Sequence, residues 1–260
     1  MEIIGYLASI FIGISLGLIG GGGSILTVPV LVYLFGVEPV IATAYSLFVV
    51  GVSSAVGVFQ KWNKKQVNLR VALIFGIPSI IIVFIIRKVL IPLIPDVIYA
   101  SQNLTIHKGP LTLILFSLLM IGAAIAMLRP KVSKSLQGIP SNYMFIIQGV
   151  LVGIVSGFLG AGGGFIIIPS LIFFASLEVK EAIGTSLLII AANSLIGFTG
   201  DLSHSLIEWP VLLPVTGLAV AGIFIGSLIA NKASAEGLRK AFGWFVLVMG
   251  LFILIKELFF

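Results

Sequence analysis

Long apolar segments constrain this chain more than any other feature of its sequence. They include residues 40–59, 71–86, 111–128, 182–200 and 238–255. Segments of about 18 or more apolar residues with few charges are typical of membrane-spanning helices. Only 9% of the residues are charged, compared with about 25% in a soluble domain. Because the runs are continuous rather than alternating, helices are favoured over a β-barrel. The sequence predicts an all-α integral membrane protein that lies in a lipid bilayer.

Composition also limits the function. The net charge of +6 indicates either a nucleic-acid partner or basic cytoplasmic loops, and the second is the common cause in a membrane protein. We therefore expect no nucleic-acid partner. The chain has no cysteine and only two histidines, His107 and His204, and it has no metal-spaced cluster or nucleophile motif. We expect no enzyme activity, no metal and no cofactor.

An ungapped internal repeat divides the chain. Residues 13–57 and 153–197, offset by 140, are identical at 14 of 45 positions, and most of the identical residues are Gly, Pro, Ser and Glu. Apolar composition alone would favour chance matches of Leu, Ile and Val, so duplication explains the pattern better. We predict two homologous halves, residues 1–134 and 135–260, which form one integral unit.

Each half opens with an apolar segment that is interrupted by glycine. The runs are residues 20–23, followed by Ser24 and Pro29, and residues 160–164, followed by Pro169. Glycine costs about 1 kcal/mol relative to alanine inside a helix, so the runs serve something other than helix stability. After the first run only about 11 apolar residues remain, roughly 16 Å of helix and half of a bilayer core. The segment is therefore either a broken single pass or a hairpin.

Loop charge favours hairpins. With two hairpins, 11 of the 15 Lys and Arg residues lie on one side; with two single passes the split is 8 to 7. Cytoplasmic loops are enriched in Lys and Arg. Each half then has one hairpin and three spanning helices, about 8–10 membrane segments in all. An odd number of segments inverts the second half, as in many secondary transporters, and places both termini outside.

The glycine runs suggest an anion site. A break that opens a short helix presents N–H donors and a positive helix end. The alternative is close helix packing, which we assign to Gly13, Gly17, Gly153 and Gly157. No Lys-Ser/Thr pair follows the runs, so a nucleotide-binding loop is not expected.

The helix after each run adds polar side chains at matching spacings. Ser46, Ser53 and Ser54 can share one face, and Ser186, Asn193 and Ser194 repeat the pattern. Back-bonding to the preceding helical turn is the alternative. The predicted substrate-binding residues are Gly21, Gly22, Gly23, Ser24, Ser46, Ser53, Gly162, Gly163, Gly164, Thr185, Ser186 and Asn193.

Charged side chains are absent from the middle of every predicted span. An anion would therefore be held by N–H groups and hydroxyls alone. Asp201 and His204 end an apolar run and are candidates for coupling or gating, although a solvated loop is the favoured alternative. Glu38 and Glu178 precede helices and are predicted to act as N-terminal caps.

These motifs resemble the TauE/SafE family of membrane transporters. The resemblance rests on the two glycine runs with Pro29 and Pro169, each followed by Ala-x-x-x-Ser-Leu at residues 42–47 and 182–187. It implies export of small sulfur-containing anions, such as sulfite or organosulfonates, across the cytoplasmic (inner) membrane. Tyr45 replaces the Thr185 of the second half, so unequal half-sites are expected.

A secondary transporter working by alternating access is therefore the leading hypothesis. An anion channel and a non-transporting membrane scaffold subunit are the alternatives. The sequence leaves open the anion, the coupling ion, the direction of flux and the oligomeric state, a homodimer included.

Overall fold

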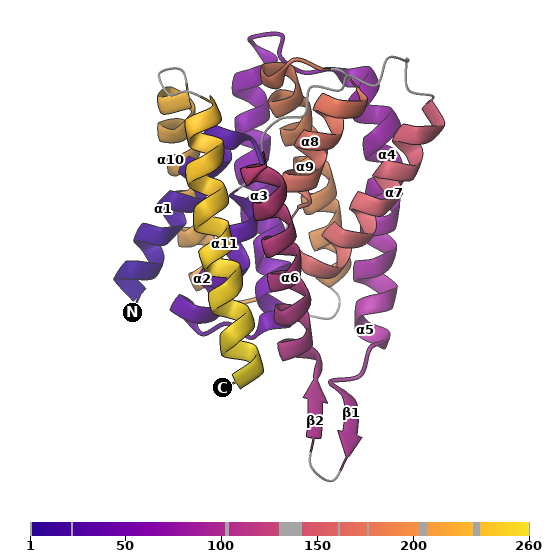
Figure 1. The fold of residues 1–260 in the computed structure, drawn as a ribbon, viewed down its shortest axis with the longest axis vertical. Coiled ribbons are helices and arrows are strands. Elements are labelled where there is room, and N and C mark those ends of the chain that lie inside the picture. Colours follow the sequence, from indigo (N-terminus) through magenta and orange to yellow (C-terminus); the bar gives the residue numbers. More distant parts are fainter. Residues whose placement is uncertain are drawn as a thin grey trace.

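A computed structural model describes residues 2–21, 23–101, 104–129, 142–160, 162–175, 177–202, 207–230 and 235–259, and most of them are helical (Figure 1). The first half contains α1 (Glu2–Ile19), α2 (Ser24–Phe35), α3 (Pro39–Trp62), α4 (Leu69–Ile85), the π-helical turn η1 (Ile86–Leu90), α5 (Ile91–Leu93), β1 (Val97–Ser101), β2 (Leu104–His107) and α6 (Lys108–Leu128). The second half contains α7 (Asn142–Leu159), α8 (Gly164–Phe174), α9 (Val179–Asp201), α10 (Trp209–Ala230) and α11 (Ala235–Phe259). In the described residues each half thus has one broken pair of helices and three longer helical segments.

Five helical segments are long and apolar enough to cross a membrane: Pro39–Trp62, Leu69–Leu93, Lys108–Leu128, Val179–Asp201 and Trp209–Ala230. In α3 and α9, 67% of the apolar window is buried, compared with 39% or less in the other three. The two helices pack against each other, so they form the centre of the bundle. The outward faces of the surrounding helices remain apolar, as lipid requires.

The first glycine run turns the chain back on itself. Tyr6, near the start of α1, packs edge-on against Phe35 at the end of α2, with 5.3 Å between ring centroids. Residues so far apart along a single pass could not touch, so the segment is a hairpin, as the loop charges predict. In Figure 1 both chain ends lie in the lower half of the view, where the β1–β2 hairpin also lies.

Helices of one half pack on helices of the other. α1 lies against α10, and α7, the repeat counterpart of α1, lies against α4. Glycine makes both contacts close: a Cβ added at Gly13 would overlap the carbonyl oxygen of Ala219, and one at Gly153 would lie 2.7 Å from that of Ser79. Gly17 and Gly157 similarly face α10 and the start of η1. The prediction that these four glycines serve close packing is confirmed.

A two-stranded antiparallel sheet departs from the purely helical prediction. β1 and β2 pair from Val97↔His107 to Ser101↔Leu104 and join the α4–α5 segment to α6. Val97, Ile98 and Tyr99 are residue types that favour strands, and all three are exposed. The hairpin extends beyond the ends of the helices in Figure 1, so it leaves the helical bundle intact.

Candidate functional site

The two glycine runs meet inside the bundle. A Cβ added at Gly21 would lie 2.7 Å from the Cα of Gly164, and one at Gly164 would lie 2.5 Å from the Cα of Gly21. The backbones therefore touch, which only residues without side chains allow. We call residues 20–23 the first glycine turn and residues 160–163 the second glycine turn. Gly22, a predicted site residue, lies outside the described residues.

Serine hydroxyls hold the first glycine turn. Ser24 donates to the carbonyl oxygen of Gly21 at 2.7 Å. Ser186, from α9, donates to the carbonyl oxygens of Ile183 at 2.8 Å and Gly20 at 3.1 Å. Gly23 packs on α1, where an added Cβ would lie 2.8 Å from the Leu16 side chain. Four of the predicted residues thus lie in or against this turn.

The second glycine turn is packed between α3 and α9. A Cβ on Gly162 would lie 2.9 Å from Oγ of Ser194 and 3.2 Å from the Val50 side chain. Gly163 faces Val152 of α7, and Gly164 also touches Ile190. Of the three glycines that the sequence predicts for this half, Gly162 and Gly164 contact the central helices and Gly163 contacts α7.

Several predicted polar atoms on α3 and α9 are buried without a hydrogen-bond partner among the described residues. They are the hydroxyls of Ser46, Ser53, Ser54 and Ser194 and the Oδ1 of Asn193. The Nδ2 of Asn193 donates to Oγ of Ser79 at 2.7 Å. Buried polar groups in proteins normally have a partner, and an exception indicates a water or an ion.

Thr185 has a different position from the rest of the predicted set. Its hydroxyl accepts the backbone N–H of Asn68 at 2.9 Å, just before α4. Tyr45, its counterpart in the repeat, accepts the backbone N–H of Glu208, just before α10. The replacement of Thr185 by Tyr45 therefore preserves one function, which is to anchor a connection of the opposite half.

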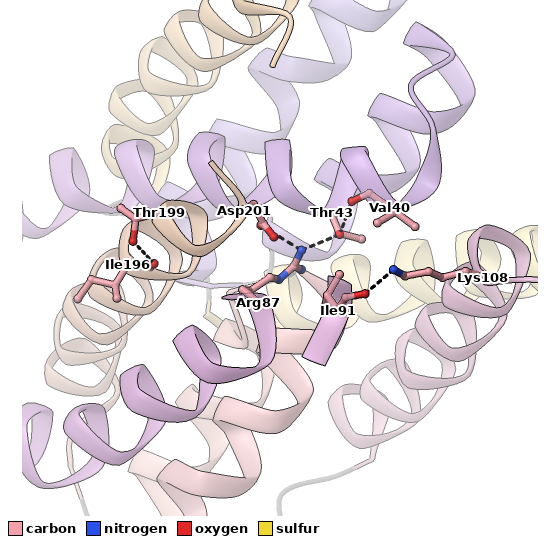
Figure 2. Close-up of polar contacts among 8 residues, drawn as sticks. All are labelled: Val40, Thr43, Arg87, Ile91, Lys108, Ile196, Thr199 and Asp201. Atoms are coloured by element: carbon pink, nitrogen blue, oxygen red, sulfur yellow. Dashed lines mark hydrogen bonds and ion pairs between the residues drawn. The ribbon is translucent and has the colours of Figure 1, made fainter. Parts of the chain in front are cut away.

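The structure adds a buried ion pair near the ends of two spans, which the expectation of uncharged span centres does not include. Arg87, in η1, is 1% exposed and Asp201, at the end of α9, is 4% exposed. The Nη1 of Arg87 donates to Oδ2 of Asp201 at 3.2 Å and to Oγ1 of Thr43 at 2.9 Å (Figure 2). Asp201 therefore belongs to a buried ion pair rather than to a solvated loop. His204 lies outside the described residues.

The length of the apolar run could have revealed Arg87. Residues 71–86 number 16, fewer than the roughly 20 that a bilayer requires, while residues 89–94 beyond Arg87 are all apolar. The helical segment continues through η1 to Leu93, which places Arg87 inside a 25-residue span. π-Helical turns inside helices are frequent at functional sites. The neighbouring Lys88 is exposed and its Nζ lies 5.2 Å from the centre of the Phe84 ring.

Arg87 borders the second glycine turn. A Cβ on Gly160 would overlap the carbonyl oxygen of Thr43 and lie 2.7 Å from Nη2 of Arg87. Gly160 also has φ +66°, in the left-handed region that favours glycine. The first turn differs, because a Cβ on Gly20 would meet the apolar side chain of Ile183. Among the residues that the structure describes, a buried charge therefore lies against the second turn but not against the first.

The two predicted caps stand at the starts of their helices, as expected. Glu38 and Glu178 are the N-cap residues of α3 and α9, and neither side chain makes a capping hydrogen bond. Their carboxylates can favour the helix ends only through charge.

The fold and the site define a class, a multi-pass helical membrane protein with two glycine turns in contact at its centre. The described residues contain no group of three or more His, Cys, Asp or Glu that could hold a metal ion. The model of the Sulfite exporter TauE/SafE family matches residues 5–253, so the chain belongs to this family.

Similar proteins from other organisms are named as probable membrane transporters. A probable membrane transporter protein of Xylella fastidiosa is 30% identical, covering 94% of this chain and 91% of the relative. Another from Methanocaldococcus jannaschii is 27% identical, covering 97% and 94%, and one from Bacillus subtilis is 26% identical, covering 94% and 96%. No solved structure matches the chain. Family and relatives together indicate a membrane transporter.

Proposed function

We propose that this protein is a secondary transporter that exports small sulfur-containing oxyanions, such as sulfite or organosulfonates, across the cytoplasmic (inner) membrane. The observation that carries the proposal is the meeting of the two glycine turns at Gly21 and Gly164 inside the bundle. Irregular backbone at membrane depth is tolerated where it is buried in protein or lines a wet cavity. The sulfite exporter family to which the chain belongs supports the choice of substrate.

Local chemistry supports an anion. Helix α8 begins at Gly164, and the first N–H groups of a helix lack helical partners and carry partial positive charge. The unpartnered hydroxyls of Ser46, Ser53 and Ser194 can donate to oxyanion oxygens. These donors are mostly neutral, so binding would be modest in affinity and reversible, as a carrier requires.

An inverted repeat would explain alternating access. Contacts between the halves come in matched pairs, which supports this arrangement. Gly57 faces Leu187, and their repeat counterparts, Gly197 and Leu47, also face each other. The hydrogen bonds of Thr185 with Asn68 and of Tyr45 with Glu208 form a second matched pair, because Tyr45 and Glu208 are the repeat counterparts of Thr185 and Asn68. One half could then rock against the other around a fixed site.

Cysteine labelling tests this topology, because the chain has no cysteine of its own. Single cysteines at Lys64, Glu236 and Thr105, which are all exposed, would be placed in turn. The inverted arrangement predicts that Lys64 and Glu236 are labelled from the cytoplasm and Thr105 from outside. Labelling of Lys64 and Glu236 from opposite sides would refute it.

Flux measurements test the function. We expect purified protein in liposomes to move sulfite or sulfoacetate, and to move them faster when the same anion is present on the far side. Electrical currents far above carrier turnover, without such stimulation, would indicate a channel instead. A folded protein that moves none of sulfite, sulfoacetate, thiosulfate, sulfate or simple carboxylates would favour the scaffold alternative.

A further inference from the structure

We propose that the edge of Arg87 formed by Nε and Nη2 binds two oxygen atoms of the transported anion, and that Thr43 and Asp201 hold the guanidinium in position for this. The inference rests on the transport function proposed above. It adds the residue that carries the charge and the geometry that selects the ligand.

The hydrogen bonds of Arg87 leave one edge unused. Nη1 donates to Thr43 Oγ1 at 2.9 Å and to Asp201 Oδ2 at 3.2 Å. Nε and Nη2 are buried and have no partner among the described residues. In a planar guanidinium, the Nε–H and one N–H of Nη2 are parallel and form a fork that matches two oxygens on one centre. The free edge is therefore a complete bidentate donor.

The free edge lies at the second glycine turn. Nη2 is the Arg87 atom that a Cβ on Gly160 would approach, at 2.7 Å. Four residues further along, Gly164 begins α8 and touches Gly21 of the first turn. Glycine at position 160 thus keeps the backbone close to a buried cation without covering it by a side chain.

Nearby groups favour an anion although Asp201 already balances Arg87. The ammonium group of Lys108 donates to the carbonyl oxygen of Ile91 (Figure 2). It also donates to the carbonyl oxygen of Ile94, on the segment that follows Arg87. Its positive charge and the positive end of α8 offset the negative charge that a ligand brings. Because Asp201 competes for the same positive charge, binding stays reversible.

Geometry then defines the ligand class. Sulfite, sulfonates and carboxylates present two oxygens on one atom and can accept both N–H bonds of the edge. A halide ion is a single spherical acceptor that the two parallel donors must share through bent hydrogen bonds, so it matches the edge less well than two oxygens do. The edge therefore predicts selectivity for oxyanions over halides of equal charge.

Binding to purified protein tests the inference. Sulfoacetate and chloride are titrated into wild type, Arg87→Lys, and the double variant Arg87→Gln with Asp201→Asn, which leaves no unpaired buried charge. We expect the double variant to lose at least tenfold in sulfoacetate affinity, equivalent to about 1.4 kcal/mol. Arg87→Lys keeps the charge but loses the fork, and we expect an intermediate loss. Lys88→Gln removes the exposed neighbouring charge and should change nothing.

The outcomes separate this inference from the transport proposal. If the double variant binds and transports sulfoacetate as wild type does, Arg87 is not the anion ligand, while the transport function stands. If wild type neither binds nor moves any oxyanion, both proposals fail. Wild type alone gives a second test that needs no variant to fold: chloride must compete for the site far more weakly than sulfoacetate, and equal competition would overturn the assignment of the fork.

Discussion

The two glycine turns share a backbone design but differ in electrostatics. Both interrupt an apolar segment, both open a short proline-containing helix, and they touch at Gly21 and Gly164. The first turn is held by the Ser186 hydroxyl on Gly20 and packs against Ile183. The second borders Arg87, whose charge is balanced by Asp201.

The repeat explains why only one turn is charged. Position 87 corresponds to Ser227 and position 201 to Lys61, so neither partner of the ion pair has been duplicated. What the halves retain is the frame of close helix contacts, and what they do not retain is the charge. An anion between the turns would therefore orient its negative end toward the second turn.

Gly160→Ala tests the difference between the two glycine turns most directly, and its effect should be large. The new Cβ would overlap the Thr43 carbonyl and would occupy a left-handed backbone conformation. We expect a loss of about 2–5 kcal/mol, from the conformational cost and the overpacking together. Gly20→Ala is the matched control, because Gly20 also has a positive φ (+77°) but its new Cβ would meet the Ile183 side chain rather than a backbone carbonyl and a buried charge. Equal losses in thermal unfolding of the two purified variants would contradict the asymmetry.

Asp201→Ala should destabilise the protein by a similar amount. It leaves Arg87 buried without its counter-charge, and breaking a buried ion pair costs about 3–5 kcal/mol. Lys61→Ala, at the corresponding position of the first half, removes a partly exposed charge and should stay within about 0.5 kcal/mol. Denaturant titration of both variants measures the difference. A Lys61→Ala loss as large as that of Asp201→Ala would show that the first half has an equivalent charge requirement.

Thr43→Val removes one bond to the guanidinium and keeps the side-chain shape. A hydrogen bond to a charged group contributes about 1.5–3 kcal/mol, so we expect a loss in this range and weaker anion binding. Thr199→Val is the control, because its exposed hydroxyl donates only to the carbonyl of Ile196 (Figure 2). Thermal unfolding and anion binding are measured for Thr43→Val and Thr199→Val. Identical results for the two variants would show that Thr43 does not hold Arg87 in position.

Ser186→Ala and Ser46→Ala should have the smallest effects, and together they test which hydroxyl supports the first glycine turn and which binds the anion. Ser186 holds Gly20, so its loss should cost about 1 kcal/mol of stability. The Ser46 hydroxyl has no partner among the described residues, so its removal should leave stability unchanged and weaken anion binding by a similar amount. Stability and affinity measured on both variants separate a structural hydroxyl from a ligand-binding one. If Ser46→Ala lost stability and Ser186→Ala lost only anion affinity, Ser46 would be the structural hydroxyl and Ser186 the ligand-binding one.

Much of the architecture could be predicted from the sequence because it depends on local patterns. Apolar length identifies the helices, the offset of 140 pairs the glycine turns, and glycine spacing identifies the packed faces at Gly13 and Gly153. The inversion of the second half and the roles of the site residues stay predictions. The short apolar run before Arg87 could have placed that residue inside a span, but no local pattern identifies its partner. Its partner Asp201 is 114 residues away, and only the folded bundle brings the two together.

The packing of α1 against α10 has a consequence for biogenesis. Gly13 and Gly17 of α1 pack against α10, which begins at Trp209, 190 residues after α1 ends at Ile19. At about 5–20 residues per second, the partner is synthesised roughly 10–40 s later. α7 has no such delay, because α4 already exists when α7 emerges. Until α10 is made, α1 packs on α2, but its face at Gly13 and Gly17 lacks the helix that covers it in the folded protein.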